Sequence, residues 1–209
     1  MKELSEICVV SWDLDGTLYS MDAMKKVLIR QLITSVRRGL WSTKEATQLI
    51  ALNAAISGCR GDTERVETFI QSAKGQRFLD LQSKWISTAL ADCGPCPNAV
   101  TTIQTLQEQG VRQVICTDYP VGKKLEVLGL ESAFEHILVA SDAGQLKPDA
   151  HVFQRLCREL SVAPHQVLHV GDRADTDGGA AAAGLKALIL GRDIQGVHQI
   201  LDEWGVSCR

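Results

Sequence analysis

The sequence of 209 residues lacks any apolar run that approaches the roughly 20 residues needed for a membrane-spanning helix. Its start, Met1-Lys2-Glu3-Leu4-Ser5-Glu6, mixes charges and is followed by no long apolar region, so no signal peptide is expected. Internal repeats, low-complexity tracts and basic-aromatic patterns typical of nucleic-acid binding are also missing. These absences favour a cytoplasmic globular protein with neither membrane nor nucleic acid as its partner.

The composition is that of an ordinary globular chain, with 45% hydrophobic residues, 22% charged residues and a net charge of −3. Seven cysteines, an odd number, are scattered along a chain too large to need disulfide staples, which indicates a reducing compartment. Residues 21–97 carry 11 Lys/Arg against 7 Asp/Glu, so the remainder is acidic. This asymmetry is either the chance solvation of helix faces or a basic unit that attracts an anionic substrate to an acidic, cation-loaded site.

Most of the chain alternates between short apolar runs and helical patterns, which predicts an α/β fold. Single helices between successive strands imply right-handed crossovers and therefore a parallel sheet. Strands are expected at residues 7–12, 111–116, 137–140, 166–170 and 187–190. Helices are expected at residues 98–109 and 149–160. Two more are expected to end at Leu128 and at Ala183, and a last amphipathic helix is expected at the end of the chain.

One block interrupts this alternation, because residues 21–91 contain helical periodicity and no strand-like run. The four helices expected here cover residues 21–40, 43–56, 62–70 and 78–91. The segment Cys93-Gly94-Pro95-Cys96-Pro97 closes the block and is typical of a connector. Its Cys-Gly-Pro-Cys tetrad also matches a thioredoxin active site, but such a site follows a strand at a helix N-terminus, and this one follows a helix. Its role stays open.

Polar residues come directly after several of the predicted strands, at the edge where an open α/β sheet binds its ligands. They are Asp13 and Asp15, Thr117, Lys147, and Asp172 with Asp177. Four converging carboxylates would repel one another, at about 4 kcal/mol for a pair ~4 Å apart at an effective dielectric near 20. A hard divalent cation removes this repulsion, and oxygen ligation with few protein ligands suits Mg²⁺.

The same residues could handle a phosphate group. The metal and Lys147 would together form a positive pocket for a dianionic phosphate, to which Thr117 offers its hydroxyl. One carboxylate could attack phosphorus and form an aspartyl-phosphate that water then hydrolyses. A second carboxylate two residues later is placed to protonate the leaving alkoxide and then to deprotonate the water.

In combination, these motifs resemble the haloacid dehalogenase (HAD) superfamily, on its phosphatase side. The motifs are Asp13-Leu14-Asp15-Gly16-Thr17-Leu18, then Thr117, then Lys147-Pro148-Asp149, then Gly171-Asp172 with Asp177 five residues later. The resemblance covers the whole chain. It implies a Rossmann-like core at residues 1–19 and 98–209 and a helical cap, inserted between the first two motifs, at residues 20–97.

The resemblance also implies roles for the motif residues. Asp13 would be the nucleophile and a Mg²⁺ ligand, and Asp15 the general acid/base with its backbone carbonyl on the metal. Thr117 would bind the phosphoryl group, Lys147 would bridge this group and Asp13, and Asp172 and Asp177 would hold Mg²⁺. Asp118 is a further candidate for substrate binding, although relatives often carry Asn there. Asp175 is an alternative to Asp177, but the spacing from Asp172 favours Asp177.

A small phosphorylated substrate is expected, because a cap that closes over the site argues against macromolecular substrates, and three activities stay open. A Mg²⁺-dependent phosphomonoester hydrolase is preferred, a phosphosugar mutase is a close variant, and a non-catalytic binding protein with the same fold is the third. Dehalogenation is disfavoured because dehalogenating members lack a carboxylate at the position of Asp15. Basic cap residues are candidates for holding the rest of the substrate: Arg30, Arg37, Arg38, Arg60 and Arg65. The protein is expected to be a monomer or a homodimer.

Overall fold

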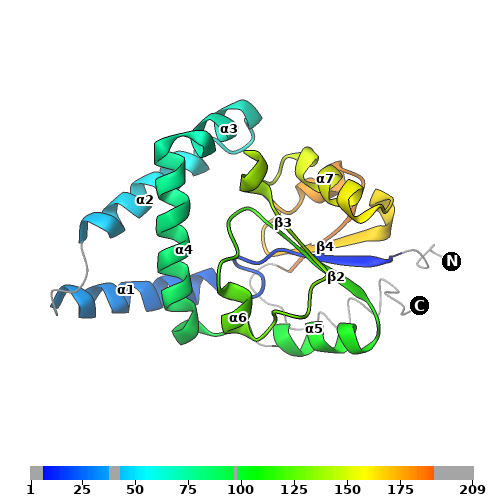
Figure 1. Ribbon diagram of the computed structural model, residues 1–209, viewed down its shortest axis with the longest axis horizontal. Helices are drawn as coiled ribbons and strands as arrows, with labels where there is room; N and C mark the ends of the chain where they lie inside the picture. Colours follow the sequence, from blue (N-terminus) through cyan, green and yellow to red (C-terminus); the bar gives the residue numbers. More distant parts are fainter. Residues whose placement is uncertain (1–6, 38–42, 97, 191–209) are drawn as a thin grey trace.

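The computed structural model describes residues 7–37, 43–96 and 98–190. Its centre is a five-stranded parallel sheet in the order β3-β2-β1-β4-β5 (Figure 1). The strands are β1 (Val9–Trp12), β2 (Arg112–Thr117), β3 (His136–Val139), β4 (Val167–Gly171) and β5 (Lys186–Ile189). The first strand of the chain is therefore the middle strand of the sheet, and the predicted parallel α/β fold is confirmed.

Helices cover both faces of the sheet. α5 (Ala99–Glu108) and α6 (Lys124–Leu128) lie on one face, and α7 (Ala150–Leu160) and α8 (Gly179–Ala182) lie on the other. Successive strand residues point to opposite faces, so Val10 and Trp12 pack with α5 and α6 while Val9 packs with α7. Burial on both faces explains why β1 is a continuous apolar run rather than an alternating pattern.

The core also contains two short 3₁₀ helices. η1 (Ala140–Ala143) follows β3, and η2 (Pro164–Gln166) follows α7. η1 begins at Ala140, a residue that the sequence pattern assigned to the third strand. The last amphipathic helix predicted from the sequence lies outside the described residues.

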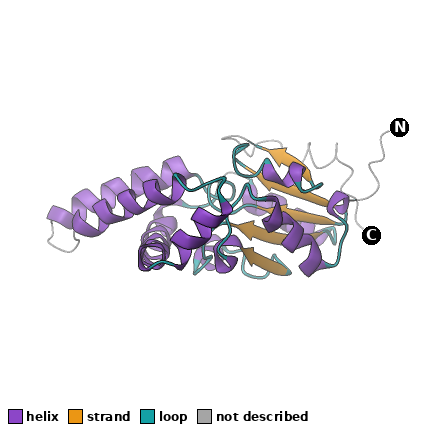
Figure 2. Ribbon diagram, turned by 90° about the horizontal axis from the view of Figure 1, so that it is seen from above, coloured by secondary structure: helices purple, strands orange, loops and turns teal. Residues whose placement is uncertain are grey.

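The first four of the five described helices between β1 and β2 form the helical cap that the sequence predicted. They are α1 (Met21–Arg37), α2 (Thr43–Ser57), α3 (Thr63–Gln71) and α4 (Ala73–Cys93). Figure 2 shows these helices at one end of the molecule and the sheet at the other. Their apolar side chains form a cluster that also includes Leu146 of the core. None of the described helices has both the length and the apolarity required to cross a bilayer.

The last cap helix begins at Ala73, five residues before the expected start at Phe78. The Ser72 side chain caps it by accepting a hydrogen bond from the Gly75 N–H at 3.1 Å. Residues 73–77 are mostly small or polar, so apolar periodicity could not reveal this first turn. At its other end α4 stops at Gly94, whose φ of +71° favours glycine, and the linker then pairs with the core through Cys96 N–H to Leu18 O at 2.8 Å.

The linker cysteines do not have the environment of a thioredoxin pair. Cys93 is the last residue of α4, at the helix C-terminus, and burial raises the pKa of its thiol. A reactive thiolate instead requires a helix N-terminus or a neighbouring cation that lowers the pKa. These observations support the connector interpretation.

Candidate active site

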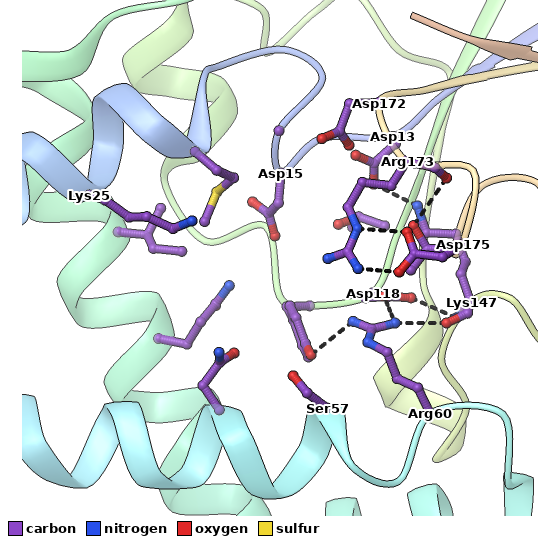
Figure 3. Close-up of a pocket in the computed structure, with 18 of the residues that line it drawn as sticks. Asp13, Asp15, Lys25, Ser57, Arg60, Asp118, Lys147, Asp172, Arg173 and Asp175 are labelled. Carbon is purple, nitrogen blue, oxygen red and sulfur yellow. Dashed lines mark hydrogen bonds and ion pairs between the residues drawn. The ribbon is translucent and has the colours of Figure 1, made fainter. Parts of the chain in front are cut away.

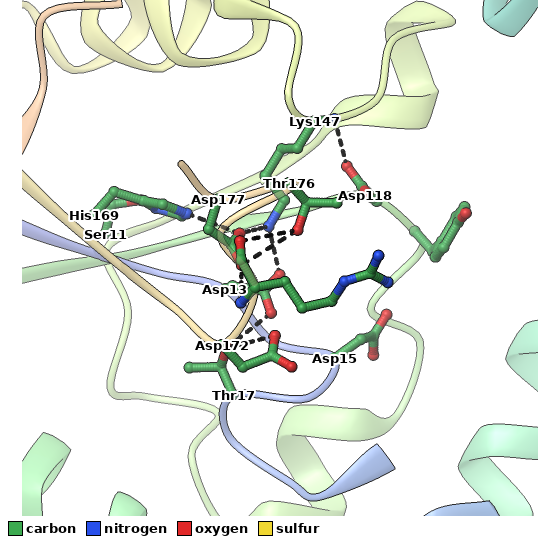
Figure 4. Close-up of polar contacts among 12 residues, drawn as sticks. Ser11, Asp13, Asp15, Thr17, Asp118, Lys147, His169, Asp172, Thr176 and Asp177 are labelled. Carbon is green, nitrogen blue, oxygen red and sulfur yellow. Dashed lines mark hydrogen bonds and ion pairs between the residues drawn. The ribbon is translucent and has the colours of Figure 1, made fainter. Parts of the chain in front are cut away.

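Three carboxylates meet at the carboxyl ends of two neighbouring strands. Asp13 directly follows β1, Asp172 directly follows β4, and Asp177 lies in the loop after β4. One oxygen of each lies within 4.8 Å of the others (Figure 4). The Asp13 N–H also donates to the Val170 carbonyl at 2.8 Å, which fixes the end of β1 against β4. The parallel pairing of the two strands therefore assembles this acidic cluster.

Lys147 supplies a buried positive charge to the cluster. Its Nζ lies 2.6 Å from Asp13 Oδ1 and 2.6 Å from Asp177 Oδ1, and the side chain is only 2% exposed. Burial opposes the charge of Lys147, but attraction by Asp13 and Asp177 outweighs it and raises the pKa of the ammonium well above its ordinary value. Lys147 is therefore charged at any physiological pH.

The carboxyl groups respond differently to this shared environment. Burial raises the pKa of Asp13 to about 8 against the attraction of Lys147, and the neighbouring charge of Asp177 raises it further. Burial also raises the pKa of Asp172. For Asp177, burial is outweighed by Lys147 and by His169, which lower the pKa below its ordinary value. The cluster thus holds more negative charge than one ammonium can balance.

Two glycines allow the backbone to approach these acids closely. A Cβ at Gly171 would lie 2.1 Å from Asp177 Cγ, and one at Gly16 would lie 2.6 Å from Asp172 Oδ2. Gly16 also has a φ of +110°, which a residue with a Cβ rarely adopts. A larger residue at either position would push an acid out of the cluster.

Asp15 does not join the other three carboxylates, contrary to the expectation that four would converge. Its side chain instead lies beside Lys124 and Tyr19, directly before the sharp turn at Gly16. Lys124 Nζ donates to both oxygens, at 2.7 and 3.0 Å, and the Tyr19 hydroxyl donates to Oδ1. Neither Lys124 nor Tyr19 can be recognised from the sequence, because a lysine at the start of a short helix and an aromatic residue after a strand are ordinary features.

Two threonine hydroxyls face the cluster. Thr17 Oγ1 donates to Asp13 Oδ2 at 2.9 Å and so orients the carboxylate. Thr117, at the end of β2, is fully buried, and its Oγ1 has no hydrogen-bond partner among the described residues. Because leaving a buried hydroxyl unpaired costs roughly 1–3 kcal/mol, an unpaired Oγ1 on a cavity wall indicates that a ligand oxygen completes it.

A buried histidine supports the cluster from behind. His169 Nε2 lies 3.2 Å from Asp177 Oδ1, and Nδ1 lies 3.1 Å from Ser11 Oγ. Burial lowers the pKa of His169, so the ring is neutral and donates one N–H to Asp177 while Nδ1 accepts from Ser11. The position of His169 within an apolar run of the sequence is the signal that it faces inward.

A cavity of about 1020 Å³ extends from the acidic cluster to the cap (Figure 3). The core side contributes Asp13, Asp15, Thr117, Asp118, Lys147 and Asp172. The cap side is a mixture of apolar and polar side chains: Lys25, Leu28, Leu49, Ile50, Asn53, Ser57, Arg60, Phe78, Gln82 and Ile86. The cavity is of the size that holds small metabolites.

Arg60 connects the cap to the core at one side of this cavity. Its guanidinium donates to Asp118 Oδ2 at 2.8 Å, to the Lys147 carbonyl at 2.7 Å and to the Tyr119 hydroxyl at 3.2 Å. The other oxygen of Asp118 accepts the Lys147 N–H at 2.8 Å. The negative charge that Asp118 adds beside the pocket is thus balanced by a cap arginine, and both its oxygens are already engaged with the protein.

The remaining candidates lie outside the cluster. Asp175 is exposed and paired with Arg173 (Nε to Oδ1, 2.9 Å), so the structure favours Asp177 as the cluster residue. Arg30 is exposed near Asp92. Arg65 is absent from the cavity lining. The side chains of Arg37 and Arg38 fall outside the described residues.

The acidic cluster fits a hard divalent cation. All its donors are carboxylate oxygens, and they lie close enough to touch one ion. Burial, and to a smaller extent the charge of Asp177, raises the pKa of Asp13 and of Asp172. Oxygen ligands on the wall of a cavity suit Mg²⁺, which keeps part of its water shell. Asp13, Asp172 and Asp177 are the residues that would hold the ion.

A parallel sheet, an inserted helical cap and an acidic cluster with a buried lysine at the strand ends define a capped Rossmann-like enzyme. The family model described as haloacid dehalogenase-like hydrolase matches residues 7–184. The chain belongs to this family and is a hydrolase.

Three proteins illustrate its relationships. The pyrophosphatase PpaX of Halalkalibacterium halodurans is 26% identical over 91% of this chain and 86% of its own length. The phosphoglycolate phosphatase of Rhodospirillum rubrum is 27% identical over 87% of this chain and 78% of its own length. The crystal structure of the putative HAD-hydrolase YfnB from Bacillus subtilis, bound to magnesium, superposes with a TM-score of 0.69 at 18% identity, over 95% of this chain and 100% of that one. This last likeness shows a shared fold.

Proposed function

We propose that the protein is a Mg²⁺-dependent phosphomonoester hydrolase that acts on a small phosphorylated metabolite through an aspartyl-phosphate on Asp13. The observation that carries this proposal is the cluster of Asp13, Asp172 and Asp177 with the Lys147 ammonium 2.6 Å from Asp13. An acidic nucleophile, a cation site and a fixed positive charge then surround one point at the cavity floor. Two relatives named as phosphatases support the assignment.

The residues of the site account for both halves of the reaction. A carboxylate oxygen of Asp13 attacks phosphorus, while Asp15 donates a proton to the leaving oxygen as the ester P–O bond breaks. Thr117 donates its unpaired hydroxyl hydrogen to a phosphoryl oxygen, and Lys147 balances the charge on the transferring group. Asp15 then takes a proton from water as the water attacks phosphorus, and breakage of the Asp13–phosphorus bond releases phosphate.

Mg²⁺, held by Asp13, Asp172 and Asp177 with the Asp15 backbone carbonyl as a further ligand, would neutralise charge on the phosphoryl oxygens. His169 and Ser11 keep Asp177 oriented for this ligation. The cap excludes bulk water from the cavity, and Arg60 links it to the core beside the phosphate site. A cavity of this size between the cap and the core favours small substrates over macromolecules.

The direct test measures phosphate release from 4-nitrophenyl phosphate and from a panel of phosphorylated metabolites, with Mg²⁺ and with EDTA. Release that requires Mg²⁺ and is fastest for a small metabolite is the expected result. Conversion of a sugar phosphate into its isomer without free phosphate would instead support the mutase. Absence of release from all substrates by folded, Mg²⁺-supplied protein would overturn the proposal and favour a non-catalytic binding protein.

Mg²⁺ affinity is expected to rise with pH. The pKa of Asp13 in the metal-free protein is about 8, and the ion binds only the carboxylate, so Mg²⁺ must displace a proton below that pH. Affinity should therefore fall by about tenfold per pH unit below the pKa of Asp13 and level off above it. Calorimetric titration in two buffers of different ionisation enthalpy measures the affinity and the released proton together. An affinity that stays constant from pH 6 to pH 9 would contradict this prediction.

A further inference from the structure

Lys124 is a buried lysine that the reaction described above does not use. It is the first residue of α6, and its side chain is 0% exposed. Removing an ammonium from water is unfavourable unless the charge is paired and hydrogen-bonded. Its Nζ donates to Asp15 Oδ1 at 2.7 Å and to Asp15 Oδ2 at 3.0 Å, so both oxygens of one carboxylate supply that pairing.

Tyr19 holds the same carboxylate from a second direction. Its ring is fully buried, and its hydroxyl donates to Asp15 Oδ1. Burial and the charge of Asp15 raise the pKa of Tyr19 well above its ordinary value, so the hydroxyl keeps its proton and remains a donor. Asp15 is thus fixed by two groups that belong to different parts of the chain.

Asp15 has one side toward the cavity and the other toward Lys124 and Tyr19. Asp15 lines the cavity, whereas Lys124 and Tyr19 are absent from the lining and stand behind the carboxylate. Asp15 Oδ1 accepts two hydrogen bonds and Oδ2 accepts one. Since a carboxylate oxygen can accept about two hydrogen bonds, Oδ2 keeps the capacity to exchange a proton with a group in the cavity.

We propose that Lys124, assisted by Tyr19, is a positioning residue that holds Asp15 with Oδ2 available for proton transfer to and from the substrate. This inference rests on the proposed function, because it assigns Lys124 a part in the acid–base step. Lys124 does not line the cavity, and its described hydrogen bonds go to Asp15 rather than to Asp13, Asp172 or Asp177. Its effect passes through Asp15, whose carboxylate would otherwise rotate about its side-chain bonds and lose the alignment that proton transfer requires.

Leaving-group dependence separates this role from a merely structural one. An alkoxide is a poor leaving group and needs a proton as the ester bond breaks, whereas 4-nitrophenolate leaves readily without one. The ratio kcat/KM reports steps up to formation of the aspartyl-phosphate, so it isolates the acid function of Asp15 from its later base function. A structural defect would lower kcat/KM equally for both kinds of ester.

The experiment compares glycerol 1-phosphate with 4-nitrophenyl phosphate as substrates of Lys124→Met. We expect kcat/KM to fall about 30- to 100-fold for the alkyl ester and less than about threefold for the aryl ester, because a positioned acid is worth roughly 10²–10⁴-fold. Lys123→Met changes the adjacent, exposed lysine and should leave both values within about twofold of the wild type. The Mg²⁺ concentration that gives half-maximal rate should not change in either variant.

Two further variants distinguish the loss of positioning from misfolding. Tyr19→Phe removes only the hydroxyl and should show the same selective loss for the alkyl ester, at about three- to tenfold. In an Asp15→Asn background, Lys124→Met should cause no additional loss, because the group that it positions is gone. Thermal unfolding of each variant establishes that the folded protein is assayed.

Equal losses for both esters, no loss for either, or a further loss in the Asp15→Asn background would each overturn the inference while the wild type still hydrolyses both esters. A folded, Mg²⁺-supplied wild type that hydrolyses neither ester would overturn the proposed function and this inference with it.

Discussion

Asp13→Asn is expected to abolish phosphate release while leaving the fold intact, with kcat falling by a factor on the order of 10⁴ or more. The amide has nearly the shape of the carboxylate and can still accept the hydrogen bond from Thr17 Oγ1. It is not a nucleophile toward phosphorus, however, and it forms no acyl-phosphate. Initial rates with 4-nitrophenyl phosphate and saturating Mg²⁺, together with a thermal unfolding curve, provide the measurement.

The fold should tolerate this change because burial disfavours the charged form of Asp13. Burial raises its pKa to about 8, so a neutral residue at this position relieves desolvation, although it removes one partner of Lys147. Asp142→Asn is the matched control, since it makes the same substitution at an exposed acid of η1, and it should retain the wild-type rate. Wild-type turnover by Asp13→Asn would show that another group, or water itself, attacks phosphorus.

The position of the acidic cluster could be predicted from the sequence, because the strand order alone brings its residues to one edge of the sheet. Asp13 and Asp172 each follow an apolar run directly, and the carboxyl ends of parallel strands share one edge of the sheet. Lys147 could be placed at the same edge because its loop follows a third strand of the sheet. The parallel topology thus restricts where these side chains can lie before any packing detail is known.

Lys124 and Arg60 could not be predicted in the same way, because their environments depend on tertiary packing. From the sequence, Lys123 and Lys124 are two equivalent basic residues, yet one is exposed and the other is fully buried. The difference arises because α6 packs against the cap helix α4, which is distant in sequence. Arg60 likewise meets Asp118 only across the interface between the cap and the core.

The expectation for Asp15 failed for a local reason. Alternation along a strand puts residues two apart on the same face, which predicted that Asp15 would lie beside Asp13. The strand ends at Trp12, however, and the backbone turns at Gly16 with a φ of +110°. Beyond a strand end the period of two no longer applies, and the available partners, Lys124 and Tyr19, determine where the carboxylate lies.

Lys147→Met is expected to lower both stability and activity, and Mg²⁺ should restore part of the stability. Lys147 Nζ lies between two buried carboxylates, at 2.6 Å from each, so its removal leaves Asp13 and Asp177 without their shared counter-charge. Removing one partner of such a buried network typically costs about 3–5 kcal/mol of unfolding free energy. Urea unfolding in EDTA and in saturating Mg²⁺ measures the loss, which should be smaller with the ion because it binds the folded state alone.

The loss should also depend on pH, with a sign that follows from the pKa of Asp13. Burial already raises this pKa to about 8 in the presence of Lys147, whose attraction lowers it, so removing the ammonium raises it further. An acid whose folded pKa exceeds its unfolded value destabilises the folded state as pH rises toward that folded pKa. The stability lost relative to the wild type in EDTA should therefore grow as the pH rises above about 8, where Asp13 has ionised in the folded wild type but is still protonated in the folded variant. Lys74→Met, at an exposed position of α4, should be as stable as the wild type under each condition. If Lys147→Met in EDTA is also as stable as the wild type above about pH 8, then Lys147 is not the charge that holds these carboxylates together.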